Sequence, residues 1–340
     1  MNRKRFVIIG FVSVLLLGAY GYSPANSGEL LYQLVSPSVL ANGASVAGGA
    51  LSGVAPEHIA LNPAVLAGEQ RLVLSLGYTG LIDSTNSSYG QAGQVGFALP
   101  TRYGVFTTAV QGVFSELESV KLGNSVTVRT AFSKDVTEKL YVGAGFSGAF
   151  GSDWAVNLDL GFVYNQGTIK AIPFLSDFRW GASLTGLGKP YSPNDTSGNP
   201  SMITPHLGLA TTLVSIDKVI VGFSSDISFP FFQNLVFDTA LQIAYADIIH
   251  LGTSWSLNLR DVMNDEASYL PTVSLSFKFG IKSKDDSFLT KKGWQQNEIV
   301  PGFAYRNLYD NVSVLSAGTL FYLGLKDTNA PEIQVWGENE

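Results

Sequence analysis

Residues 154–165 read WAVNLDLGFVYN, and the order of side chains in this stretch decides the fold class. Large apolar side chains stand at every second position, and mostly small or polar side chains fill the positions between them. A period of two residues is typical of a β-strand with one apolar face. The single charge, Asp159, falls on the polar face. The stretch therefore predicts a strand that separates an oily side from a polar side.

The same alternation recurs along the chain after Arg71. It predicts fourteen strands, near 70–80, 91–99, 103–114, 125–134, 139–150, 153–165, 177–187, 203–213, 217–228, 235–246, 248–260, 271–281, 297–309 and 312–325. Most of them are as long as a tilted membrane-spanning strand, which takes about 9–11 residues. The segment 297–309 departs most from the pattern, because Pro301 cannot donate a ladder hydrogen bond.

The positions of the charges distinguish a membrane barrel from a soluble β-sandwich. A sandwich carries many Lys and Glu on the polar faces of its strands, whereas these faces are mostly Gly, Ser, Thr and Ala. The charges that do occur share the polar parity: Arg129, Asp159, Arg179, Asp226, Asp238 and Lys278. A cation on a lipid-facing position would cost about 2–4 kcal/mol. We therefore expect an all-β fold, a 14-stranded antiparallel transmembrane β-barrel, and keep the sandwich as the alternative.

Aromatic residues and connections support the barrel. Six aromatic residues are expected near strand ends or on the outer face, as in the girdle of a membrane barrel: Tyr78, Trp154, Tyr164, Trp180, Tyr245 and Trp255. Short connections are expected at 100–102, 134–138, 215–217 and near Asp247, and long outer loops at 81–90, 115–124, 188–202 and 261–270. Two connections, 166–176 and 282–296, are long on the side that should be short.

The first residues predict export. A basic start is followed by an apolar run from Phe6 to Gly18, and small residues flank a cleavage point after Gly21. We interpret residues 1–21 as a signal peptide. A membrane anchor is the alternative, although the run is shorter than the about 20 residues that a spanning helix needs. The chain has no cysteine, which excludes lipid attachment through a thioether, disulfides and cysteine metal sites.

Composition points to the outer membrane. Removing residues 1–22 takes away three basic residues and no acidic one, so the net charge falls from −6 to −9, which argues against nucleic-acid binding. Charged residues make up 14% of the chain and hydrophobic ones 46%, while soluble domains average about 25% charged residues. No later run of 18 apolar residues is present. An exported, apolar chain without such runs is typical of an outer-membrane barrel.

Residues 22–69 are expected to form a hatch inside the barrel, which itself spans 70–325. The segment is rich in Ala, Gly and Ser and lacks strand alternation, and its end, ALNPAVLAG (60–68), places a stiff turn in an apolar run. Asn62 can turn the chain through its amide, and Pro63 fixes the next φ. We expect a rigid corner between hatch and wall, with Asn62 shaping the corner rather than touching cargo.

The chain also resembles a known family. Ser36-Pro37, Gly48-Gly49-Ala50 and Asn62-Pro63-Ala64 resemble the start of FadL-type long-chain fatty acid outer-membrane transporters. The stretch DLGFVYNQG…FRWGASLTGLGKP (159–190) is similar to their relatives, the PorV-type proteins and an uncharacterised treponemal outer-membrane barrel family. The resemblance implies a hatch-plugged barrel that carries hydrophobic molecules inward, with Asn62, Pro63 and Ala64 near the ligand path. Residues 326–340 then form a periplasmic tail or the start of a further module.

Three functions stay open, and none needs a cofactor. The favoured one is passive uptake of fatty acids or similar hydrophobic molecules, with Arg129 and Arg179 as possible head-group contacts in the lumen. The second is a structural or shuttle role, in which the tail or the 282–296 loop binds periplasmic proteins. The third is a barrel lipid hydrolase, which would need His206 or His250 beside a serine. The three histidines, including His58, lack metal-ligand spacing, so we expect neither a catalytic nor a metal site.

Overall fold

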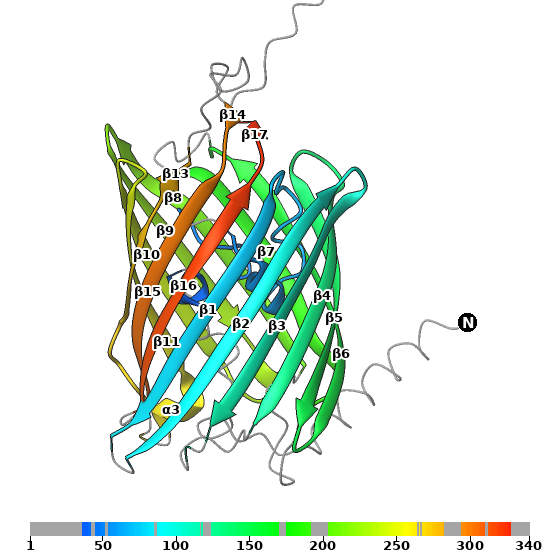
Figure 1. Cartoon of the computed structure of the whole chain (residues 1–340), viewed down its shortest axis with the longest axis vertical. Coiled ribbons are helices and arrows are strands. Elements are labelled where there is room, and N and C mark those ends of the chain that lie inside the picture. Colours follow the sequence, from blue (N-terminus) through cyan, green and yellow to red (C-terminus); the bar gives the residue numbers. More distant parts are fainter. Residues whose placement is uncertain are drawn as a thin grey trace, which may run out of the picture.

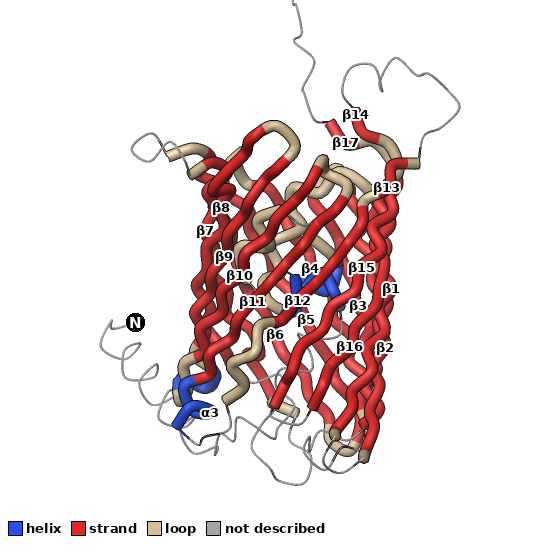
Figure 2. The backbone as a smooth tube through the Cα atoms, turned by 90° about the vertical axis from the view of Figure 1, so that its left-hand side faces the viewer, coloured by secondary structure: helices blue, strands red, loops and turns tan. Residues whose placement is uncertain are grey.

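The computed structural model is one antiparallel sheet closed into a barrel, as Figures 1 and 2 show. It describes residues 36–41, 45–51, 54–84, 87–115, 117, 124–169, 175–191, 203–263, 265, 267–281, 294–309 and 312–327. The strands pair with their neighbours along the chain, and β1 pairs with β16 to close the wall. The predicted barrel of 14 antiparallel strands is confirmed, and its closure excludes the sandwich. The signal peptide and most of the predicted tail lie outside the described residues.

The wall strands follow the predicted segments in order. They are β1 Leu72–Asp83, β2 Ser88–Thr101, β3 Gly104–Ser115, β4 Ser125–Asp135, β5 Leu140–Gly151, β6 Trp154–Gly167, β7 Ser176–Lys189, β8 Thr204–Ile216, β9 Val219–Ser228, β10 Val236–Tyr245, β11 Ile249–Asn258, β12 Thr272–Phe277 with its continuation β13 Phe279–Gly280, β15 Glu298–Tyr309 and β16 Val312–Leu323. The short elements are α2 Pro37–Ala41, η2 Pro56–Ala60, η4 Pro230–Phe232, α3 Leu259–Met263, and the two-residue strands β14 Trp294–Gln295 and β17 Lys326–Asp327, which pair with each other.

The alternation in the sequence becomes an inner and an outer face. In β1, Leu76 and Tyr78 are exposed on the outside, whereas Ser75 and Thr79 are buried. The aromatic residues Tyr78, Trp154, Trp180, Tyr245 and Trp255 are all exposed, and the ring of Tyr164 lies 6.0 Å from that of Trp180. The charges of the polar parity lie on the inner face, where Asp159, Asp226 and Asp238 are buried. An apolar outer face combined with a polar interior is typical of a membrane-spanning barrel.

Both ends of the wall meet at one rim. We call the rim where β1 begins and β16 ends the terminal rim, and the opposite one the distal rim. At the terminal rim the predicted short connections are confirmed, and β6–β7 and β13–β15 are joined by longer ones. At the distal rim the loop predicted at 81–90 is wrong, because β1 and β2 pair as far as Asp83↔Ser88. The loop predicted at 261–270 is also corrected, since its first residues belong to α3.

The wall is irregular at one seam. β12 pairs with β15 only from Val273 to Ser276, and pairing resumes at β13 after a break at Lys278. The register places Phe277 opposite Pro301, which has no N–H to donate. The backbone N–H of Lys278 instead donates to the carbonyl of Ile248 at 2.8 Å.

In the described part of the chain, no helix is long and apolar enough to cross a membrane. The helices α2 and η2 are short and lie within the barrel, as Figure 1 shows. They belong to residues 36–69, which we call the N-terminal segment.

Candidate functional site

Side chains of the barrel lumen hold the backbone of the N-terminal segment. Arg179 in β7 donates from Nε to the carbonyl of Ala47 at 2.8 Å and from its terminal nitrogen to the carbonyl of Gly49. Asp226 in β9 accepts the backbone N–H of Val46 at 2.8 Å. Further bonds to the segment come from Ser183, Gln242 and Ser254. The polar side chains that point into the lumen from these strands therefore bind the N-terminal segment.

The Asn-Pro corner is fully buried and spans segment and wall. The Asn62 amide donates to the carbonyls of Val46 at 2.8 Å and Phe162 at 3.1 Å, and its oxygen accepts the N–H of Ala64 at 2.9 Å. The last bond closes the side-chain turn that Asn favours, and Pro63 fixes the φ within it. Every polar atom of the Asn62 side chain is thus used for structure.

Glycines in β5 and β6 make room for this corner. A Cβ on Gly143 would lie 2.5 Å from the backbone carbonyl of Pro63, and one on Gly161 would lie 2.1 Å from Oδ1 of Asn62. No side chain fits at these two positions while the corner stays in place. The wall is therefore shaped to receive Asn62-Pro63.

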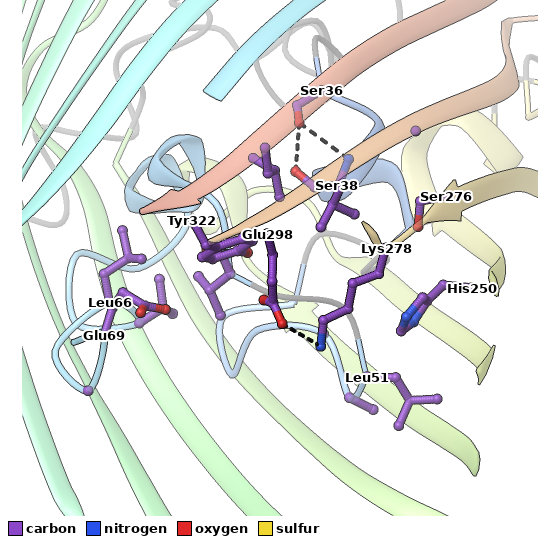
Figure 3. A pocket seen from close by; sticks show the side chains of 18 of the residues that line it. Ser36, Ser38, Leu51, Leu66, Glu69, His250, Ser276, Lys278, Glu298 and Tyr322 are labelled. Carbon is purple, nitrogen blue, oxygen red and sulfur yellow. Dashed lines mark hydrogen bonds and ion pairs between the residues drawn. The ribbon is translucent and has the colours of Figure 1, made fainter. Parts of the chain in front are cut away.

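A cavity of about 580 Å³ remains between the N-terminal segment and the wall, and Figure 3 shows it from close by. Its wall side is formed mainly by β12, β15 and β16 and by β6 and β7, and residues of the terminal-rim connections also line it. Much of its surface is apolar, through Leu51, Val54, Val65, Leu66, Val300 and Leu320. A cleft of this size that combines apolar surface with polar groups can hold a small molecule.

The polar part of the cavity is a network of ion pairs near the terminal rim. Glu298 binds Arg71 at 2.8 Å and lies 3.4 Å from Lys278, which also pairs with Asp247 at 2.8 Å. The Arg71 guanidinium lies 4.5 Å from the centre of the Tyr322 ring. Figure 3 shows Lys278 reaching toward Glu298, with His250 beside it. The network links Arg71, just before β1, and β15 to the turn between β10 and β11 and to the β12–β13 break. It neutralises Arg71 and Lys278.

The wall beside the cavity is thin. Gly77, Gly318 and Gly302 stand in register across β1, β16 and β15, so this row carries no side chains of its own, and the ring of Pro37 lies against Gly318 and Gly302 on the inner side. The cavity lining accordingly includes Leu76 and Phe303, whose side chains are exposed on the outer, apolar face. At this place the inner cavity and the outer surface are close together.

An apolar cluster lies on the distal side of the lumen. Leu117 and Tyr191, which follow β3 and β7, are buried in one apolar cluster with residues at the distal ends of the strands, among them Leu81 and Val113. The hydroxyl of Tyr191 accepts the backbone N–H of Ser152 at 3.1 Å. Among the described residues, this cluster covers the distal side along β1–β3, β5, β6, β15 and β16.

The predicted site residues occupy different places. Asn62, Pro63 and Ala64 do not line the cavity, so their role on a ligand path stays a prediction. Arg179 lines the cavity, but it already donates to the N-terminal segment. Arg129 lies away from the cavity and donates to Gln111 at 3.4 Å.

The histidines show no hydrolase arrangement in the described residues. His206 lies 3.4 Å from Asp226, and neither His206 nor His250 makes a hydrogen bond to a serine there. The same residues hold no group of three His, Asp or Glu side chains suited to a metal ion.

Sequence reasoning missed Glu57, His250 and Glu298 as cavity residues. The signal for Glu57 was available, because it is an isolated acidic residue in an apolar stretch of the segment. The pairing of Glu298 with Arg71, 227 positions away in sequence, had no local signal.

The fold and site define a class: a membrane-spanning β-barrel whose lumen is occupied by its own N-terminal segment, with a cavity between the two. No protein-family model matches the chain, and no curated protein matches it. Among solved structures, the Pseudomonas putida toluene transporter TodX is similar, with 14% identity, 85% of this chain and 99% of that chain covered, and a TM-score of 0.49. A Pseudomonas aeruginosa FadL homologue is 10% identical over 85% of this chain and 97% of its own, with a TM-score of 0.48. Acinetobacter baumannii Omp33 is 11% identical over 74% and 98%, with a TM-score of 0.40.

Proposed function

We propose that the protein is an outer-membrane transporter for the passive uptake of long-chain fatty acids or similar hydrophobic molecules. The observation that carries this proposal is the cavity of about 580 Å³, about half apolar, between the N-terminal segment and the wall. Burial of each methylene group contributes about 0.8 kcal/mol, so such a cavity binds an alkyl chain without specific chemistry. The apolar outer face supports the membrane location, and the similarity to TodX and a FadL homologue prompts the choice of cargo.

The shuttle alternative has less support. A barrel that only presents a surface needs no cavity, and here one is present. The pairing of β14 with β17 at the terminal rim, visible in Figure 1, gives the 282–296 connection and the start of the tail a common anchor. Binding of periplasmic proteins there stays a prediction, to be checked by pull-down with and without residues 328–340.

Filling the cavity tests the transporter proposal. Val300 lines the cavity, whereas its neighbour Ile299 lies on the opposite parity of β15 and outside the lining. Val300→Trp should displace about two methylenes of cargo and lower uptake of a fluorescent fatty acid into proteoliposomes about tenfold. Ile299→Trp, the matched control, should leave uptake unchanged. Equal uptake by both variants would contradict a route through this cavity.

A further inference from the structure

The charges around the cavity are unbalanced. Its lining carries six carboxylates against four cations: Glu57, Glu69, Glu138, Asp177, Asp247 and Glu298 against Arg71, Arg179, Lys278 and Lys326. An anionic head group entering this space would meet an excess of like charge, which disfavours binding.

Three of the four cations already have protein partners. Arg71 and Lys278 share Glu298, and Arg179 donates to two backbone carbonyls of the N-terminal segment. Lys326 belongs to β17, beyond the end of the last wall strand. To obtain any cation other than Lys326, a carboxylate head group would have to break an existing ion pair or undock the segment.

Glu57, by contrast, has an unused acceptor. It is 8% exposed on η2, where Oε1 accepts the hydroxyls of Ser36 and Ser38. Its second oxygen, Oε2, has no hydrogen-bond partner among the residues that the structure describes. A buried acceptor without a partner is unfavourable, and a donor on a ligand would relieve that cost.

The neighbouring histidine does not neutralise Glu57. His58 is fully buried and its Nδ1 accepts the N–H of Ala55 at 3.0 Å. Burial lowers the pKa of His58 below its ordinary value, although the charge of Glu57 opposes this. The ring is therefore neutral at neutral pH and adds no positive charge beside the carboxylate.

We propose that the cavity selects hydrophobic molecules whose head group donates a hydrogen bond, such as a hydroxyl or an amine, and rejects ionised carboxylates, with Glu57 as the acceptor. This inference rests on the proposed transport function and specifies its cargo. A fatty acid would then enter as the neutral acid, whose O–H is a donor.

The test compares three ligands of equal chain length on the full chain held in amphipol: radiolabelled decane, decanol and decanoate. Binding is measured by equilibrium gel filtration at a pH well above the carboxylic acid pKa of about 4.3. Decanol should bind about tenfold more tightly than decanoate. In Glu57→Gln, decanol should bind more weakly and decanoate more tightly, so that the preference is lost. Asp217→Asn removes one negative charge from an exposed turn outside the cavity lining and should keep the preference.

Decane separates the possible failures. It has no head group, so it should bind equally to the original protein and to Glu57→Gln, and this also shows that the variant retains its cavity. If decane and decanoate bind well and decanol has no advantage, the head-group inference is wrong and the transport proposal stands. If none of the three binds, the cavity is not a cargo site and the transport proposal fails as well.

Discussion

Gly143→Ala is expected to displace the N-terminal segment from the lumen. The new Cβ would lie 2.5 Å from the carbonyl carbon and oxygen of Pro63 and 2.6 Å from the nitrogen of Ala64. These are backbone atoms of a corner whose φ is fixed by proline, so they cannot move aside as a flexible side chain would. Overpacking of this kind costs about 1–3 kcal/mol. The substitution therefore weakens the contact between the N-terminal segment and the wall.

Two measurements report the displacement. Limited proteolysis of the folded protein in detergent should begin to cut within residues 54–69, most of which are buried in the original protein. Planar-bilayer recordings should show larger and more frequent openings, because the segment no longer fills the lumen. Gly80→Ala is the matched control, since a Cβ at Gly80 meets nothing within 4 Å. Unchanged protection in Gly143→Ala would mean that the corner is not held by the wall.

Val95→Arg is expected to destabilise the barrel in a bilayer by about 2–4 kcal/mol. Val95 lies in the middle of β2, and 57% of its surface is exposed on the apolar outer face. An arginine there must carry its charge into the hydrocarbon or bend toward the head groups. Urea unfolding in phospholipid vesicles measures the loss of stability directly.

A second valine provides the control for this substitution. Val136 is 55% exposed, nearly the same as Val95, but it lies in the turn after β4 at the terminal rim. Val136→Arg should therefore change the free energy of unfolding little. Equal effects of the two substitutions would show that β2 does not face lipid, and the membrane location would have to be given up.

The wall was predictable because its signal is local. Side chains in a strand alternate between two faces, so the sequence around Asp159 already separates lumen from lipid. Strand ends were less predictable, and β1 and β2 continue to Asp83 and Ser88 because small and polar residues also support a tight hairpin. The position of Pro301 did mark an irregularity, which appears as the break opposite β12.

The cavity was not predictable, because it depends on where the N-terminal segment docks. The parity of Arg179 placed it in the lumen, but no local pattern showed that backbone carbonyls at Ala47 and Gly49 would take its donors. The role of Asn62 was easier to predict, because an Asx turn involves only neighbouring residues. Its amide oxygen accepts the backbone N–H of Ala64. Its bond to Phe162 joins residues that are far apart in sequence.

The short pairing between β12 and β15 affects where the barrel begins to unfold. Strands β1 and β16, the first and last strands of the wall, are joined by an unbroken ladder from Leu72 to Asp83. β12 and β15, which are closer in sequence, share only four residue pairs before the break. Backbone amides of β12 and β15 near this break should exchange with deuterium first. On heating, the barrel should open between β12 and β15 rather than between β1 and β16.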